Sequence, residues 1–493
     1  MTIQQKMLQT FGMKNTIFSK SQKTIILATI LSIACIVYAL ISLVNHYLFK
    51  TYALDLGFYT HAMYDYAHFR ADDCSMILTK PQSILSAHFD LYLVILSPLV
   101  YLFGTYTLLI VQIAAVLFGG LGIYKLIGLY SDDNLIPLGA MVAFLFSFGI
   151  IHALSYDYHS NVVSTMMLPW MLYFLKKGRY RLSTLFVVLI VMGKENMSLW
   201  LFFIAIGLMW DYRKDKKTLW YLFGYTVFAV VYFVVVNMII LPKLGANGII
   251  RYAYLGDNYW EIAKNLITEP RKTLQILFTN TSDWPRFDGV KTEFYLCALA
   301  SGMLLTFLKP NYLIMLIPLL AQKMLSIDPN FWGIALQYNI EFVPILVISS
   351  FLVALRLKQT NWKRIVSIAV VLSVIITTFY TIGVPKTKIQ TDKLCMYQGR
   401  HYEQKDFDAN FARKLIQEIP KEASVCAAPM FVPHLCLRSE IYDFAYTNNH
   451  QKATYLLINR YYFNHEKNNE SLLNEYEVIE TDGTVILLKK KHG

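Results

Sequence analysis

Long apolar stretches broken by short polar ones make up most of the chain. The first follows the polar residues 1–23, and the last ends near residue 383. A helix needs roughly 20 apolar residues to cross the hydrocarbon core of a bilayer. We therefore predict an all-α polytopic membrane domain over residues 24–383. Its eleven expected spans are 24–48, 107–129, 135–153, 161–176, 182–194, 196–210, 218–241, 293–308, 312–326, 338–356 and 365–383.

Basic residues are concentrated in three short polar segments between the expected spans. These are KKGRYR (176–181), DYRKDKK (211–217) and RLKQTNWKR (356–364). Short loops rich in Lys and Arg stay in the cytoplasm. We therefore place the N-terminal segment 1–23 inside, read the first span as an uncleaved anchor, and place the C-terminus outside.

Thiol labelling tests this topology. A cysteine introduced at position 178 is expected to resist a membrane-impermeant reagent in intact cells, because the basic loop around it faces the cytoplasm. A cysteine at position 420 should react, and the parent chain supplies the background. Labelling of position 178 from outside would show that the orientation is inverted.

The apolar stretch HFDLYLVILSPLVYLFG (88–104) does not fit this orientation as a span, because it would invert every later loop. We interpret it as a re-entrant or interfacial helix on the outer side. The alternative is that it crosses and that a weaker predicted helix does not.

Two charges stand inside an otherwise apolar stretch at Lys194 and Glu195. One straight helix over residues 182–210 would be about 43 Å long, against a hydrocarbon core of about 30 Å. A helical hairpin avoids this mismatch and keeps the flanking basic loops on one side. Both charges then lie at its outer turn, either in a polar cavity or at the interface, where long charged side chains can reach water.

Three polar regions are expected to face outward: residues 49–106, 242–292 and 384–493. The second holds an amphipathic helix with apolar positions at Ile262, Leu266, Leu274 and Leu277. The third changes in composition: DFDANFARKLIQEIP has helical spacing, ASVCAAP and ATYLLI indicate strands, and YEVIETDGTVILLKK predicts a hairpin at Asp482-Gly483. We predict a small extracytoplasmic α/β domain over residues 384–493.

Composition supports this division of the chain. Of 493 residues, 56% are hydrophobic and 16% charged, and the formal net charge is +12. The tail is nearly neutral, so the excess belongs to the membrane domain, where basic loops and anionic lipids explain it without nucleic acid. No Cys/His spacing resembles a zinc site, while Cys74, Cys395, Cys426 and Cys436 fall outside the membrane, where disulfides can form.

Ionisable residues gather at the predicted outer ends of helices. There is no Walker A sequence, GxGxxG after a strand or HExxH, which removes support for ATP-driven transport. A carboxylate can deprotonate an acceptor hydroxyl, and a lysine or histidine can neutralise a departing phosphate. This set suits transfer from a lipid-linked phosphate donor. The candidate catalytic residues are Asp55 and Asp157; the candidate substrate-binding residues are His88, His159, Lys194 and Glu195.

Several stretches resemble an uncharacterised family of multispanning bacterial membrane proteins. They are LDLGFYTHAMYD, LSAHFDLYLVILSPLVYLFGTYTLLIVQ, SYDYHSNVV, VMGKENMSLW, RYAYLGDN, IPKEASVCAAPMFVPHLCLRSEIYDF and ATYLLI. The resemblance covers most of residues 50–490 and extends to the GT-C superfamily of glycosyltransferases, which use polyprenyl-phosphate sugar donors. It implies a GT-C-like fold in the bacterial inner membrane.

The resemblance also suggests roles for single residues. GT-C relatives carry an essential acidic residue in the first outer loop, which Asp55 matches, although the pair often seen there is incomplete because Leu56 follows. Asp157 matches a second acidic residue of these relatives, which follows the third span. Lys194 matches a lysine at the turn after the fifth span. His88 lies where relatives have a polar or basic residue before a short interfacial helix. Where a His-Tyr pair is expected before the penultimate span, this chain has Gln337-Tyr338.

The resulting hypothesis is an inverting glycosyltransferase that moves a sugar from a polyprenyl-phosphate donor to an extracytoplasmic acceptor. The acceptor, whether glycan, lipid or protein, stays open, as does a divalent metal ion, which some relatives bind. A transporter or lipid-handling protein on the same scaffold is the alternative. Transporters often show repeats with broken helices in matched halves, and this sequence shows no such repeat.

Overall fold

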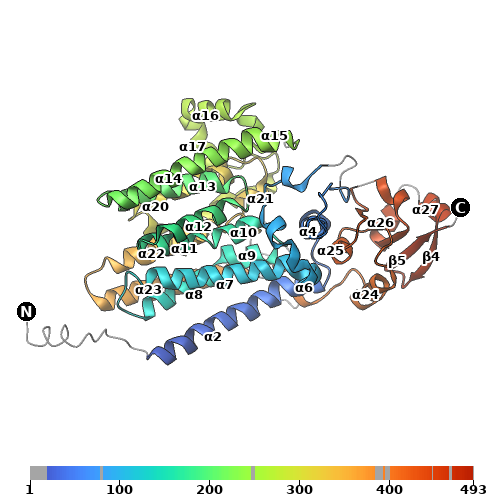
Figure 1. Cartoon of the computed structure of the whole chain (residues 1–493), viewed down its shortest axis with the longest axis horizontal. Coiled ribbons are helices and arrows are strands. Elements are labelled where there is room, and N and C mark those ends of the chain that lie inside the picture. Colours follow the sequence, from blue (N-terminus) through green and yellow to red (C-terminus); the bar gives the residue numbers. More distant parts are fainter. Residues whose placement is uncertain are drawn as a thin grey trace, which may run out of the picture.

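Figure 1 shows the computed structural model, a long bundle of helices with a small α/β domain at one end. The structure describes residues 19–77, 82–245, 250–382, 392–394, 400–446, 448–465 and 469–491. Most of the expected N-terminal segment 1–23 and the start of the tail therefore lie outside the described residues.

Every predicted span coincides with helical structure. The helices run along the length of the bundle and carry the basic loops at the end opposite the α/β domain (Figure 1). They are α2 (Lys20–Tyr38) continued by η1 (Ala39–Leu43) and α3 (Val44–Tyr47), α7 (Thr107–Ile127), α8 (Leu135–Leu145) with α9 (Phe148–Ser155), α10 (Ser160–Thr165) with α11 (Leu168–Lys176), α12 (Tyr180–Val191), α13 (Met197–Asp211), α14 (Lys216–Val234) with η6 (Val235–Ile240) and α15 (Leu241–Lys243), α18 (Val290–Ala298) with η9 (Leu299–Met303) and α19 (Leu304–Thr306), α20 (Pro310–Met324), α22 (Phe342–Leu355) and α23 (Thr360–Thr381).

Length and composition make this a membrane protein. Five helical runs in the described residues are long and apolar enough to cross a bilayer: 21–47, 92–127, 135–155, 216–243 and 360–381. Three further apolar helices, α12, α13 and α22, are shorter, and α22 is almost entirely buried among the others. The fold is thus mostly helical, as predicted, with several apolar spans.

The segment 88–104 forms short helical pieces instead of one regular helix. These are α5 (Tyr92–Leu96) and α6 (Val100–Phe103), joined by a 3-10 turn. Gly104, with a positive φ of 56°, interrupts the helix before α7. The hydroxyl of Tyr92 donates to the carbonyl of Leu189 (2.6 Å), and that of Tyr101 donates to the carbonyl of Ala67 (3.0 Å). Both ends of the segment therefore stay at the end of the bundle that carries the α/β domain.

The predicted hairpin around Lys194 and Glu195 is confirmed. Helix α12 ends at Val191 and α13 begins at Met197, so both charges lie in the turn. A Cβ on Gly193 would lie 2.1 Å from the hydroxyl oxygen of Ser164 and 2.8 Å from the carbonyl oxygen of Ser160. Glycine therefore allows the turn to pack directly against α10.

The amphipathic helix expected within residues 242–292 is wrong in one respect: it is two helices. Helix α16 (Tyr259–Thr268) ends just before α17 (Pro270–Phe278), because Pro270 has no N–H to continue the first helix. Three of the expected apolar positions, Ile262, Leu266 and Leu277, pack on a small core, whereas Leu274 is 60% exposed.

The tail forms a mixed five-stranded sheet with the order β2-β1-β3-β5-β4. Strand β1 pairs in parallel with β2 and β3, and β5 pairs antiparallel with β3 and β4. The predicted hairpin is β4–β5, with Gly483 at a φ of 85°. The elements are α24 (Ala409–Glu418), β1 (Val425–Ala427), β2 (Ile441–Asp443), β3 (Tyr455–Asn459), β4 (Tyr476–Thr481) and β5 (Val485–Lys490).

The tail packs onto the connection that follows the first membrane helix. Phe49, Ala53 and Met76 belong to the same buried cluster as the apolar residues of the sheet. The ring of His434 stacks on that of His46 with centroids 4.1 Å apart. Cys74, Cys426 and Cys436 are free thiols, so no disulfide forms among them, and Cys395 lies outside the described residues.

Candidate active site

Asp55 lies in a short π-helix, η2 (Ala53–Gly57), directly before α4 (Phe58–Ala67). Single π-turns are frequent at functional sites. The first residues of α4 receive no side-chain cap, so Asp55 does not serve as a helix cap. Its carboxylate instead accepts a hydrogen bond from the side chain of Tyr156, which precedes α10.

Asp157 is held in a strained and almost completely buried position. Its φ of 42° is uncommon for a residue with a side chain. Gln112 of α7 fixes this loop from both sides, donating to the carbonyl of Asp157 (3.0 Å) and accepting from the amide of His159 (3.0 Å). Strain of this kind persists only where the surroundings enforce it, and it is concentrated at functional sites.

A lysine from the tail pairs with Asp157. Lys393 Nζ lies 2.5 Å from Asp157 Oδ1, and the amide of Tyr52 donates to Asp157 Oδ2 at 3.1 Å. The same ammonium lies over the rings of Tyr52 (4.8 Å) and Tyr156 (4.5 Å). A residue 236 positions away in the sequence thus neutralises a buried carboxylate beside Asp55.

The surroundings of Asp55 favour a carboxyl group that titrates near neutrality. The pKa of Asp55 is raised to about 6, chiefly by burial and then by the charge of Asp157. The charges of Lys393 and Lys194 lower this pKa, and so does the hydrogen bond from Tyr156. A general base is most effective when its pKa lies near the working pH.

Lys194, Glu195 and His88 form a second charged group beside this one. His88 Nδ1 lies 3.1 Å from Glu195 Oε1, and the amide of Phe89 donates to Glu195 Oε2 at 3.2 Å. Burial opposes the charge of Glu195, but His88 and Lys194 lower its pKa to about 2. Burial and Lys194 lower the pKa of His88, so this imidazole is neutral at pH 7. Its bond to Glu195 places the proton on Nδ1 and leaves Nε2 as an acceptor.

The six residues singled out from the sequence are thus brought together. The charges of Asp157 and Lys194 act on Asp55, and that of Lys194 also acts on both His88 and His159. The ring of His159 stacks on Tyr156, and its buried Nε2 has no hydrogen-bond partner among the residues that the structure describes. Burial holds the pKa of His159 well below its usual range. Nearby Asp90 accepts from the Tyr158 hydroxyl (3.2 Å) and the Tyr92 amide (2.9 Å).

Sequence reasoning missed Lys393, Arg251 and Tyr338. The charge of Arg251 reaches Lys194 and His88, and its guanidinium lies 4.7 Å from the ring centre of Phe331. Phe331 stacks on Tyr338, which is close enough to interact with Asp55. Arg251 stands in RYAYLGDN, a stretch that carries the family resemblance, and Tyr338 stands in the Gln337-Tyr338 pair, where the chain departs from the expected His-Tyr pair. No local signal marks Lys393.

The described residues contain no group of three His, Cys, Asp or Glu side chains placed to hold a metal ion. The positive charges beside Asp55 and Asp157 are the ammonium groups of Lys393 and Lys194. The side chains described at this site therefore do not fit a divalent ion bound by protein ligands alone.

Comparison with solved structures shows a GT-C-like fold. The crystal structure of ArnT from Cupriavidus metallidurans bound to undecaprenyl phosphate matches with a TM-score of 0.53 and 9% identity, covering 96% of this chain and 98% of that chain. The apo form gives a TM-score of 0.53 and 10% identity, covering 95% and 98%. Identities this low show the fold alone.

Comparison by sequence identifies the family. Among curated proteins, none matches this chain. A family model matches residues 45–483, which include the membrane helices after the first, the candidate site residues and most of the α/β domain. The chain therefore belongs to the family described as predicted membrane protein (DUF2079).

Proposed function

We propose that this protein is an integral membrane glycosyltransferase that moves a sugar from a polyprenyl-phosphate donor to an extracytoplasmic acceptor. The observation that carries the proposal is the carboxyl group of Asp55, whose pKa is raised to about 6 within reach of the charge of Lys194. A GT-C fold surrounds this pair, and a structural relative, ArnT, has been crystallised with undecaprenyl phosphate. A base beside a phosphate-binding cation is the arrangement that such a transfer requires.

The reaction is a single displacement at the anomeric carbon of the donor sugar. Asp55 takes the proton of the acceptor hydroxyl, whose oxygen forms the new bond to that carbon. The bond from the carbon to the phosphate oxygen breaks, and polyprenyl phosphate leaves with the electron pair. Attack from the opposite face inverts the configuration, and no metal ion is needed to balance the step.

Lys194 and Arg251 are the proposed contacts to the leaving phosphate. Both are cations, and their charges act on each other, so an anion between them would relieve the repulsion. His88 is neutral at pH 7 and offers Nε2 as an acceptor, so it suits a sugar or acceptor hydroxyl better than a phosphate. Asp157, held by Lys393, positions Tyr52 and Tyr156 around Asp55 and is a positioning residue in this scheme.

Lys194→Ala tests the phosphate contact. Undecaprenyl phosphate binding to the purified full-length chain is expected to weaken by about 10- to 100-fold, because a charge-assisted hydrogen bond contributes roughly 1.5–3 kcal/mol. Lys264→Ala, which removes an exposed lysine from α16, is the matched control and should bind as the wild type does.

Consumption of a lipid-linked sugar donor distinguishes a glycosyltransferase from a lipid-handling protein. Release of undecaprenyl phosphate from undecaprenyl-phosphate-linked sugars is measured with purified protein and envelope glycans or lipids as acceptors. Sugar transfer that depends on Lys194 supports the enzyme. A chain that binds undecaprenyl phosphate but releases no sugar from any donor would instead be a lipid-handling protein, the alternative function.

A further inference from the structure

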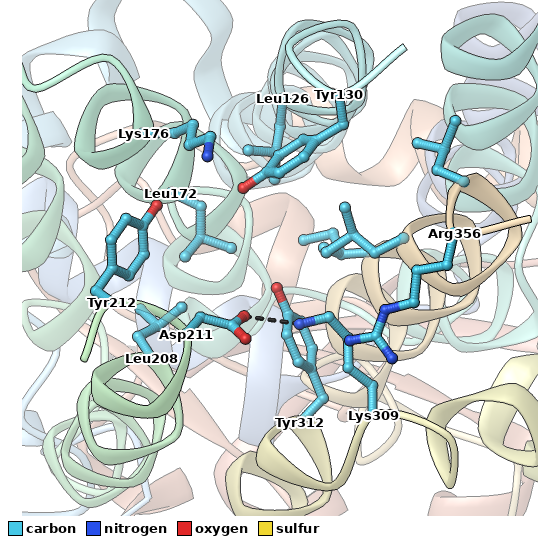
Figure 2. A pocket seen from close by; sticks show the side chains of 13 residues that line it. Leu126, Tyr130, Leu172, Lys176, Leu208, Asp211, Tyr212, Lys309, Tyr312 and Arg356 are labelled. Atoms are coloured by element: carbon cyan, nitrogen blue, oxygen red, sulfur yellow. Dashed lines mark hydrogen bonds and ion pairs between the residues drawn. The ribbon is translucent and has the colours of Figure 1, made fainter. Parts of the chain in front are cut away.

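A polar pocket lies at the end of the bundle opposite the α/β domain. Its volume is about 340 Å³, within the usual size of small-ligand sites. Figure 2 shows side chains from several helix ends pointing into one space. Lys176 ends α11, Asp211 ends α13, Lys309 precedes α20 and Arg356 follows α22. None of these residues belongs to the candidate active site.

The pocket carries an excess of positive charge. Lys309 is buried and pairs with Asp211 at 2.7 Å (Figure 2). Within the described residues, Lys176 and Arg356 have no carboxylate partner. Arg356 Nη1 donates to the carbonyl of Leu308 at 3.1 Å. With Asp211 counted against three cations, the pocket has a net charge of +2, which favours an anionic ligand.

Tyrosine hydroxyls add neutral hydrogen-bond donors to these cations. Tyr130, Tyr212 and Tyr312 all line the pocket. Lys176 Nζ lies 4.8 Å from the ring centre of Tyr130, and Lys309 Nζ lies 4.4 Å from that of Tyr312. A planar guanidinium and hydroxyl donors around ammonium groups form a donor set suited to phosphate oxygens.

The inner walls are apolar. They are formed by Leu126, Leu172, Leu208, Ile348 and Leu352, which face the polar side chains from the bundle interior. A ligand with hydrocarbon attached to its phosphate would therefore contact both parts of the pocket. Basic pockets between membrane helices on the cytoplasmic side bind anionic lipid head groups in other proteins.

We propose that this pocket binds a phosphate-bearing anion through Lys176, Lys309 and Arg356. The apolar walls favour the head group of an anionic phospholipid as its source, and a free phosphate is the other source of the same chemistry. The site is independent of sugar transfer, because it uses different residues at the other end of the bundle.

Thermal unfolding of the purified, delipidated full-length chain tests the site. Melting temperature is followed while dioleoylphosphatidylglycerol, dioleoylphosphatidylcholine or inorganic phosphate is titrated. Phosphatidylglycerol is expected to stabilise the wild type more than phosphatidylcholine does. In Lys176→Gln and Arg356→Gln, the apparent affinity for phosphatidylglycerol should fall roughly fivefold for each charge removed. Both residues are exposed, so these variants are expected to fold.

Lys177→Gln is the matched control, since it removes the neighbouring exposed lysine, which does not line the pocket. It should respond to phosphatidylglycerol as the wild type does. Stabilisation by inorganic phosphate that is lost in the Lys176 and Arg356 variants would support the site with a soluble anion as ligand. Equal stabilisation by phosphatidylcholine would overturn the proposal. So would an unchanged phosphatidylglycerol affinity in a variant that combines Lys176→Gln with Arg356→Gln.

Discussion

Replacing Asp55 with asparagine is expected to abolish sugar transfer while the protein still folds. Asparagine has nearly the same size and still forms hydrogen bonds, but it cannot accept the acceptor's proton. Loss of a general base typically costs 10²–10⁴-fold in rate. The substitution should reduce kcat with little change in donor binding, because the phosphate contacts come from Lys194 and Arg251.

The stability of Asp55→Asn should move in the opposite direction to its activity. The pKa of Asp55 is raised to about 6 in the folded chain, so its ionised form is destabilising above that pH. A shift of about two units corresponds to roughly 3 kcal/mol. At pH 8, the variant should therefore melt at the same or a higher temperature than the wild type. This gain should shrink as the pH falls from 6 towards 4, where the wild-type carboxyl is protonated.

The wild-type pH profile provides a third readout for the same residue. Asp55 acts as a base only when ionised, so kcat/KM should fall as the pH drops below about 6. Transfer activity and melting temperature are measured on purified wild type and Asp55→Asn across this range. Full transfer by a well-folded Asp55→Asn protein would show that Asp55 is not the catalytic base.

A loss of activity could not be attributed to a lost helix cap, because Asp55 caps no helix in the structure.

The membrane helices could be predicted because lipid imposes one simple rule on the sequence. Every span needs an apolar stretch of suitable length, and the polar interruptions mark the ends. The turn at Lys194 was predictable for the same reason, since a charged pair inside a stretch too long for one crossing favours a hairpin. In contrast, the three-residue strand β2 (Ile441–Asp443) is too short to give a pattern.

The outer cluster could be predicted only in part. Asp55, Asp157 and Lys194 follow from polar residues at the outer ends of helices and from the family resemblance. Lys393 could not be found in this way, because its position depends on how the tail packs back onto the bundle. The pocket at the opposite end was hidden for a different reason. Lys176 and Arg356 stand in loops whose charge is already explained by membrane topology, and Lys309 is a single lysine between two apolar stretches.

Of the contacts between the tail and the membrane domain, the buried ion pair between Lys393 and Asp157 is expected to cost the most stability when one partner is removed. The side chain of Asp157 is 1% exposed and that of Lys393 9% exposed. In Lys393→Met, an uncompensated carboxylate would remain buried, which typically costs 3–5 kcal/mol. The variant should therefore melt well below the wild type. Lys405→Met, at an exposed lysine of the same tail, should melt as the wild type does.

A double variant separates charge compensation from general damage to the tail. In Lys393→Met with Asp157→Asn, no buried charge is left unpaired, so most of the lost stability should return. The activity profile adds a second test, because Lys393 lowers the pKa of Asp55 whereas Asp157 raises it. The acid limb of kcat/KM should therefore move to higher pH in Lys393→Met and return towards the wild-type position in the double variant. If Lys393→Met melts like the wild type and the acid limb of its kcat/KM profile does not move, Lys393 neither neutralises the charge of Asp157 nor lowers the pKa of Asp55.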